Sequence, residues 1–421
     1  MHGTGTIPGV SLAAVPLCLS VPPVHRAEQA ASSGVGVREA PAQTRPRPRQ
    51  EDGLCEAYSS DMAAAPGASE DAQLLLNVGL IEKDTNGEAL WVWCYPYISA
   101  EFRELLLRKC RLREDKPRPL YSFLYGQYKR LWFYIMLTHV AGASVLHQVT
   151  HFCLALVAKD YNPEKYAAFS RTLSRVYIKN GSPVPMVESY ISVLTKGVCQ
   201  SEENGTFVSR DYDQLKAYTS GSIRDVVSQF GMETVILYTA LMLKKRIAVF
   251  HPKLEVVQEF TRVLPALVWH RQDWSILHPY VHLIQEETED LKTCPGYIAG
   301  FHNSDVSNRP DLYDVYVNLA ESSISVSQSA KEALTLGKLH KEIGQVMVQA
   351  TEDPDKSESQ VIKDISVKTR EILSILSSLA EVTRDGDWPA ISLEQLKQRR
   401  LPPATENFLF QLAAAEQMLL T

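Results

Sequence analysis

The stretch QLLLNVGLIEKDTNGEALWVWCY, residues 73–95, decides the fold of the first half of the chain. Two apolar runs, residues 74–81 and 90–95, flank Asn86-Gly87, and this pairing is a strong hairpin signal because both turn residues tolerate a positive φ. The second run alternates two apolar sets, Leu90, Val92 and Cys94 on one face and Trp91, Trp93 and Tyr95 on the other. Since both faces are apolar, we expect this strand to lie in the centre of a sheet with helices on both sides.

Helix caps and further apolar runs extend the pattern to residue 196. Ser99 precedes a helical pattern that should end before Pro117, and Asn162-Pro163 begins a second helix as N-cap and first-turn proline. The other expected elements are strands over residues 121–128, 131–140 and 148–157 and a helix over residues 186–196. The order β-β-α-β-β-β-α-α predicts an antiparallel sheet flanked by helices.

The pattern changes after a polar segment, residues 198–215, which we interpret as a linker. Beyond it, helices alternate with short apolar strands, and this alternation predicts a mostly parallel sheet. The expected elements are helices over residues 223–230, 234–245 and 254–263 and strands over residues 247–250, 297–301 and 315–319. The apolar spacing within residues 330–382 predicts an antiparallel pair of helices. The fold class expected is therefore α/β, with two lobes.

Composition excludes some functions. The chain has 421 residues and a formal net charge of -6, without the basic excess that nucleic-acid binding requires. Its seven cysteines show no clustered spacing, which favours a reducing cytosol. Residues 1–61 are rich in proline and poor in aromatic residues, so we expect a disordered extension. Within it, prolines interrupt the apolar run at residues 10–24, which argues against a signal peptide.

Residues 131–158 contain no charged side chain and are long enough to span a bilayer. However, three histidines and several other polar residues lie within this stretch, where a membrane would penalise them. Two apolar strands joined by a small-residue turn, residues 141–144, explain the same composition without that cost.

No sequence motif for bond-making chemistry appears. The chain lacks a phosphate-binding loop and a nucleophile elbow, and we assign no catalytic, cofactor-binding or metal-binding residue. Two histidine pairs with helical spacing, His147 with His151 and His278 with His282, fall in predicted strands or loops, so ordinary packed or solvated histidines are the favoured interpretation. His251 and His302 each follow an apolar strand, where α/β folds often place functional side chains, although a polar residue that ends a buried strand is the favoured explanation.

Two charge clusters remain. The acidic run comprises Glu286, Glu287, Glu289 and Asp290. It is interpreted as a solvated face rather than a cation site, because adjacent carboxylates do not converge. The basic cluster comprises Arg108, Lys109, Arg111, Arg113, Lys116 and Arg118. It is either an exposed helix end or a contact for anionic lipid, and the exposed helix end is favoured.

Residues 238–326 resemble the central part of a DENN domain. The resemblance rests on YTALMLKKRIAVF (238–250), PALVWHRQDWSILHPYV (265–281), PGYIAGFH (295–302) and DVYVNLAESSIS (314–325). It implies a longin-like first lobe over residues 73–197, the linker over 198–215, and a central DENN α/β lobe with a C-terminal helical region over 216–421.

The same resemblance implies guanine nucleotide exchange on a Rab-family GTPase in endosomal trafficking, by a cytoplasmic protein at late endosomes. The GTPase would lie across the groove between the lobes, but the resemblance assigns it no contact residues. The alternative is an adaptor in an endosomal sorting assembly that docks coiled-coil partners. The helices at residues 330–382 have the spacing to do so, although their packing against the lobe is the favoured interpretation. In either case no nucleic acid or cofactor is expected, and membrane association is at most peripheral.

Overall fold

The computed structural model describes residues 71–112, 121–140, 142, 145–201, 205–382 and 389–419. The chain divides into two units, Met1–Met62 and Ala63–Thr421, and every element described below belongs to the second. The predicted disordered extension, its apolar run at residues 10–24 and the last three residues of the basic cluster lie outside the described residues.

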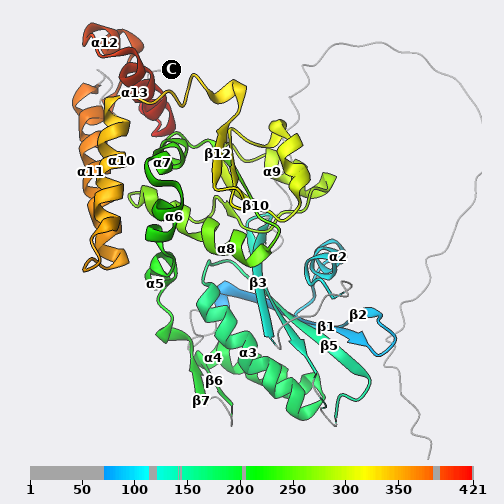
Figure 1. Cartoon of the computed structure of the whole chain (residues 1–421). Helices are drawn as coiled ribbons and strands as arrows, with labels where there is room; N and C mark the ends of the chain where they lie inside the picture. The colour runs from blue at the N-terminus through cyan, green and yellow to red at the C-terminus, as the bar shows by residue number, and fades with distance from the viewer. Residues whose placement is uncertain are drawn as a thin grey trace, which may run out of the picture. The chain divides into compact units, whose positions relative to one another are not determined.

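An antiparallel sheet of five strands forms the first half of the folded unit, in the order β2-β1-β5-β4-β3 (Figure 1). Its strands are β1 (Leu75–Asp84), β2 (Ala89–Tyr95), β3 (Tyr121–Tyr128), β4 (Leu131–His139) and β5 (Val149–Ala158). The accompanying helices are α1 (Asp71–Leu74), α2 (Ala100–Lys109), α3 (Pro163–Asn180) and α4 (Pro183–Lys196). Buried residues of α3 and α4 pack on one face of the sheet and those of α2 on the other, which confirms the predicted sheet flanked by helices.

The predicted helix boundaries follow from local chemistry. The Ser99 hydroxyl accepts a hydrogen bond from the Phe102 amide at 3.3 Å, and the Asn162 side chain accepts one from the Lys165 amide at 3.2 Å. These oxygens satisfy amides that the first turn of a helix leaves unpaired. Gly181 then ends α3 with a φ of 61°, a conformation that favours glycine.

The expected central position of the second strand is wrong, because β2 lies at the edge of the sheet. Leu90 and Val92 are 57% and 47% exposed, so part of the apolar surface of this strand is not covered. The predicted alternation of its faces is also wrong, because an irregularity opposite Leu80 and Ile81 puts Leu90 on the same face as Trp93 and Tyr95. Trp91 packs on the opposite face against Gly79, where any larger side chain would collide with the indole. An alternation of apolar residues cannot distinguish burial in a core from exposure at an interaction surface.

The uncharged stretch 131–158 forms β4 and β5, as predicted, and these strands pair with each other in register from Trp132 to His139. The turn that joins them lies partly outside the described residues. Among the described residues, no helix has both the length and the apolar character needed to span a membrane.

A short hairpin occupies most of the segment that we interpreted as a linker. It consists of β6 (Val198–Ser201) and β7 (Gly205–Val208), followed by the short helix η2 (Ser209–Asp211). Cys199 and Phe207 are buried against the core, and Phe207 stacks on Phe169 of α3 with 5.0 Å between ring centroids. This segment therefore packs on α3 and α4. The domain boundaries that we expected from the sequence remain predictions.

A second sheet of five strands follows, in the order β12-β11-β8-β10-β9. Strands β9, β10, β8 and β11 are parallel, and only β12 pairs antiparallel, which confirms the mostly parallel sheet. Its strands are β8 (Arg246–Phe250), β9 (Leu277–His278), β10 (Tyr297–Phe301), β11 (Val315–Asn318) and β12 (Ser323–Val326). Its α-helices are α5 (Gln214–Thr219), α6 (Ile223–Phe230), α7 (Thr234–Met242), α8 (Leu254–Val263) and α9 (Gln285–Lys292).

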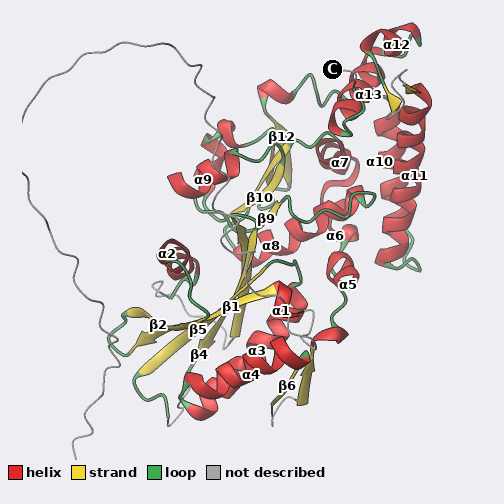
Figure 2. Cartoon of the chain, turned by 180° about the vertical axis from the view of Figure 1, so that it is seen from behind, coloured by secondary structure: helices red, strands yellow, loops and turns green. Residues whose placement is uncertain are grey.

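The C-terminal region is mainly helical, as predicted. Its elements are α10 (Lys338–Glu352), α11 (Glu358–Leu379), β13 (Glu381–Val382), β14 (Pro389–Ala390), α12 (Leu393–Gln398) and α13 (Pro403–Ala415). Helices α10 and α11 pack side by side, and both contact α6 (Figure 2). Their apolar positions, such as Ile343, Met347, Ile365 and Ile372, are buried in the core of this unit.

One continuous apolar cluster joins the two sheets. It runs from Val78 and Leu156 of the first sheet to Ile247 and Ile298 of the second. A smaller cluster brings Tyr280, which follows β9, against the α2 side of the first sheet. Among the described residues, no strand of one sheet is therefore paired with a strand of the other, but the two sheets share a core.

Candidate protein-binding site

Lys109, at the C-terminal end of α2, joins the first sheet to the second. Its ammonium donates to the Tyr280 carbonyl oxygen at 2.8 Å and to Glu287 Oε2 at 2.6 Å. It also lies 4.2 Å from the centroid of the Tyr280 ring. Lys109 is 1% exposed and Glu287 is 6% exposed, so this ion pair is buried. Burial lowers the pKa of Lys109 to about 8, although the charge of Glu287 opposes the shift.

Two histidines lie beside this ion pair. His282 Nε2 is 3.1 Å from the Tyr280 hydroxyl, and the ring centroids of His282 and His302 are 5.5 Å apart. Burial, together with the charge of Lys109, lowers the pKa of His282 to about 2. His282 is therefore neutral, and its approach to Glu287 at 3.7 Å is not an ion pair.

The structure thus joins residues that the sequence analysis placed in separate clusters. Lys109 belongs to the basic cluster and Glu287 to the acidic run, and both were interpreted as solvated. That interpretation is wrong for these two residues, because each is buried by its partner 178 positions away. Arg108, Glu286 and Glu289 are exposed, as expected.

The other predicted histidine positions are dispersed. His151 faces His139 across β4 and β5 with 4.8 Å between ring centroids, while His147 is exposed in the preceding turn. His278 is buried in β9, where burial lowers its pKa to about 4. His251 and His302 follow the neighbouring strands β8 and β10, and the His251 amide donates to the Phe301 carbonyl oxygen. In the described ranges, no group of three or more His, Cys, Asp or Glu residues is placed to hold a metal ion.

Helix α8 makes a second polar connection between the sheets. The Gln258 amide donates to the Tyr125 carbonyl oxygen of β3, and Arg262 donates to Glu164 of α3 and to Ser220. Arg262 is 7% exposed. Because these bonds are directional and buried, they fix the first sheet relative to α8.

The exposed edge of the first sheet presents an apolar surface, which we name the β2–α4 face. It consists of Leu90, Val92 and Tyr95 of β2 and Val184, Val187 and Ile191 of α4. Five of these six side chains are among the fourteen large apolar side chains that are exposed in the described residues, and Val187 is half-buried. So high a concentration of exposed apolar groups on two neighbouring elements marks an interaction surface.

Strand register places Leu90 and Tyr95 on the side of the sheet that α3 and α4 cover. Leu90 pairs with Glu82, whose carboxylate accepts a hydrogen bond from Tyr177 of α3. Tyr95 pairs with Val78, and its ring meets that of Tyr190 of α4 edge-on at 6.0 Å. Since paired residues point to the same face, Leu90 and Tyr95 both point toward α3 and α4.

The α4 residues form a stripe beside that strand. Val184, Val187 and Ile191 are spaced i, i+3 and i+7, so they lie on one side of the helix. Met186, Tyr190 and Val193 point into the core instead. This outward stripe is visible in the sequence, but the helix has apolar residues on two sides, and only the contacts show which side is covered.

The described residues bring together polar connections between the sheets and an apolar contact surface. The class of protein that this fold and site define is a mixed α/β protein with an exposed apolar face on its first sheet. Two comparisons place it more narrowly. A family model described as "Stabilization of polarity axis" matches residues 220–328, which contain the second sheet.

Relatives match almost over their whole length. The human protein DENN domain-containing protein 10 is 66% identical over 358 residues, 85% of this chain and 99% of the relative. The Danio rerio protein of that name is 62% identical over 82% of this chain and 98% of the relative, and the Dictyostelium discoideum protein is 33% identical over 81% and 96%. The chain belongs to the DENN domain-containing protein 10 family.

Proposed function

We propose that this chain is a guanine nucleotide exchange factor for a Rab-family small GTPase and that the GTPase contacts the β2–α4 face. DENN-domain proteins are in general associated with Rab exchange. The observation that carries the proposal is the apolar β2–α4 face, whose valine, isoleucine and tyrosine side chains are suited to a protein partner.

Exchange of this kind makes and breaks no covalent bond. A factor that binds the nucleotide-free GTPase more tightly than the loaded form must, by linkage, lower the affinity of the GTPase for nucleotide by the same factor. To do so, it has to hold the switch segments away from Mg²⁺ and the phosphates. A firm apolar contact on a rigid sheet edge supplies the binding free energy for that displacement.

The connections between the two sheets provide the rigidity. The Lys109–Glu287 pair and the Arg262–Glu164 contact hold the second sheet against the first. Family resemblance implies that the GTPase lies across the groove between the lobes, so we expect helices of the second half that border the first sheet, such as α8, to complete the interface. We further propose a cytoplasmic protein that associates peripherally with late endosomes.

A GDP-release assay tests the proposal. Fluorescent GDP is loaded on a panel of Rab proteins, and the full chain is added in substoichiometric amounts. We expect faster release from at least one Rab. The double variant Val92→Glu/Ile191→Glu should lower the catalytic efficiency at least tenfold, about 1.4 kcal/mol, because it places charge in an apolar contact.

A matched control carries the same substitutions elsewhere. Val367 and Ile375 of α11 are 42% and 40% exposed, close to the values of 47% and 39% for Val92 and Ile191. Val367→Glu/Ile375→Glu should therefore leave exchange unchanged. Acceleration of no Rab would refute exchange, while equal loss in both variants would refute the assignment of the face.

The adaptor function is the second candidate, and one observation favours it. The i, i+3, i+7 stripe on α4 has the spacing that a partner helix recognises. The helices at residues 330–382 bury most of their apolar positions within this chain, so we place the partner helix on the β2–α4 face. Stable co-purification of coiled-coil proteins, lost in Val92→Glu/Ile191→Glu and without nucleotide release, would support this candidate.

A further inference from the structure

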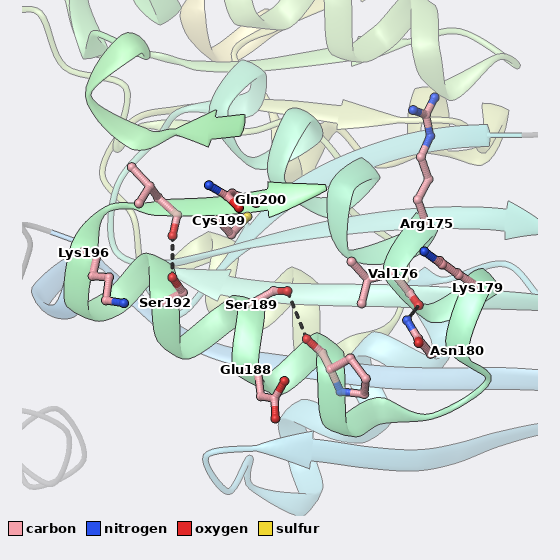
Figure 3. Close-up of a pocket in the computed structure, with 12 residues that line it drawn as sticks. Arg175, Val176, Lys179, Asn180, Glu188, Ser189, Ser192, Lys196, Cys199 and Gln200 are labelled. Carbon is pink, nitrogen blue, oxygen red and sulfur yellow. Dashed lines mark hydrogen bonds between the residues drawn. The ribbon is translucent and has the colours of Figure 1, made fainter. Parts of the chain in front are cut away.

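A groove of about 570 Å³ lies on the other side of α4, between α3, α4 and β6 (Figure 3). Its volume is within the range of small-molecule sites, and it exceeds what a single inorganic anion fills. The Ser192 hydroxyl donates to the Val198 carbonyl oxygen at 2.7 Å and so fixes β6 to α4. The walls of the groove are therefore parts of one rigid body.

The charges that line the groove are mostly positive. Arg175 and Lys179 extend from α3 on one side, and Lys196 extends from α4 on the other, with Glu188 as the one carboxylate among the lining residues (Figure 3). The whole chain has a net charge of -6, so this cationic excess is local and opposite in sign to the protein. Neither Arg175 nor Lys196 forms an ion pair with any residue in the described ranges.

The other residues that line the groove do not neutralise this positive charge. Cys199 is buried at the base of the groove, and burial raises the pKa of its thiol to about 12, so the sulfur carries no charge at neutral pH. The Ser189 and Ser192 hydroxyls donate to backbone carbonyl oxygens. The donors left for a ligand include the side chains of Arg175 and Lys196 and the exposed amide of Gln200.

We propose that this groove binds a small phosphorylated molecule with at least two phosphate groups, one held by Arg175 and the other by Lys196. Arginine matches two oxygens of a phosphate at once, and a lysine ammonium binds phosphate as a point charge. The positions of the two cations, on opposite walls, favour two separated anionic groups over one. Glu188 can accept a hydrogen bond from a hydroxyl group between them, which favours a phosphorylated polyol.

Such a ligand has two sources, a soluble polyol phosphate or the headgroup of a phosphorylated lipid. Direct binding distinguishes them. A soluble inositol bisphosphate is titrated into the full chain by calorimetry, and the corresponding inositol lipid is presented in phosphatidylcholine vesicles for co-sedimentation. Binding of the soluble probe indicates a free ligand, and binding only to the vesicles indicates a lipid headgroup. Either outcome supports the groove as the site if the substitutions below weaken that binding.

Arg175→Gln/Lys196→Gln should weaken binding at least tenfold, about 1.4 kcal/mol. Gln200→Glu, which adds a negative charge at an exposed position, should also weaken it without affecting the fold. Since neither readout involves nucleotide exchange, the result is independent of the proposed Rab activity.

The control pair is Lys363→Gln/Arg370→Gln. These two cations line a second cavity of about 350 Å³, beside α11. Loss of the same size in this control would show binding by overall charge and overturn the proposal. It would also be overturned if the unmodified chain bound neither probe, or if Arg175→Gln/Lys196→Gln bound as well as the unmodified chain.

Discussion

A lysine ammonium that is removed from water needs other partners, and Lys109 has three. They are the Glu287 carboxylate, the Tyr280 carbonyl oxygen and the face of the Tyr280 ring. Glu287 in turn accepts from the His282 amide at 2.8 Å. Loss of either charge would therefore leave the other buried and incompletely compensated.

We predict that Lys109→Met lowers the free energy of unfolding by about 3–5 kcal/mol, because it leaves the Glu287 carboxylate unpaired in the core. Urea denaturation followed by circular dichroism measures this loss. Adding Glu287→Gln should restore part of it, since the second substitution removes the isolated charge.

The matched control is Lys292→Met on the same helix as Glu287. Lys292 pairs with Asp311 at 2.8 Å, but the two side chains are 42% and 44% exposed. Exposed pairs contribute at most about 1 kcal/mol. A Lys109→Met variant no less stable than Lys292→Met would contradict the role assigned to the buried pair.

His278 makes stability depend on pH. Burial lowers its pKa to about 4 from an ordinary value of 6.5, so below pH 6.5 the unfolded chain binds a proton that the folded chain excludes. Its contribution is complete above pH 6.5 and is lost as the pH falls from 6.5 toward 4. At about pH 5 the loss is about 2 kcal/mol.

We predict that His278→Phe reduces this acid sensitivity, measured as the difference between free energies of unfolding at about pH 7 and about pH 5. His147→Gln removes an exposed histidine and should leave the difference unchanged. If His278→Phe and the unmodified chain lose equal stability on acidification, His278 is not the group responsible.

At the scale of the element, local signals in the sequence were sufficient to predict where helices begin. The sequence carried no signal for contacts between distant elements. Caps such as Ser99 and Asn162 act through hydrogen bonds that span three residues, so the sequence identifies them directly. The burial of Lys109 depends on a residue in another sheet, and no periodicity carries that information. The prediction that β2 is a central strand was wrong for a related reason. Its exposed side chains are apolar, like those of a strand buried in a core.

The groove and the β2–α4 face were missed as sites for the same reason. Each combines residues from elements that are adjacent only after folding. Helix α4 contributes to both, with an apolar stripe toward β2 and polar residues toward α3. Its sequence shows the two kinds of residue, but only the structure shows that the core occupies the third side.

Two glycines in different elements should respond oppositely to alanine. In β10, a Cβ on Gly300 would lie 2.4 Å from Val257 of α8 and 2.6 Å from the Pro279 carbonyl oxygen. Because the Pro279 backbone cannot move away without disturbing the chain around it, we predict that Gly300→Ala lowers the free energy of unfolding by about 1–3 kcal/mol.

In α10, a Cβ on Gly344 would meet mainly the flexible end of Met232 at 2.8 Å. Alanine gains up to about 1 kcal/mol of helix propensity there, which offsets the movement of Met232. Thermal denaturation of Gly344→Ala should therefore give an unchanged or higher midpoint. A midpoint lowered as much as that of Gly300→Ala would show that α10 tolerates no adjustment at this contact.

At the scale of the whole folded unit, the sheets depend on each other. One apolar cluster contains residues of both sheets, and the polar contacts of Lys109, Gln258 and Arg262 cross between the two halves. If the sheets separated, each would expose part of this cluster and leave buried charges unpaired. Both costs oppose a state in which one sheet is folded and the other is not.

We therefore predict a single cooperative unfolding transition for residues 71–419. Hydrogen exchange with mass spectrometry reports on each sheet separately, through peptides from β4 and β5 and from β8 and β10. Their slowest amides should exchange with the same free energy of opening, because both sheets open only in global unfolding. Arg262→Ala removes one polar contact and should lower both values together. Two distinct opening free energies in the unmodified chain, or a change confined to one sheet in Arg262→Ala, would show that the sheets fold independently and that the junction is too weak to present a rigid surface to a GTPase.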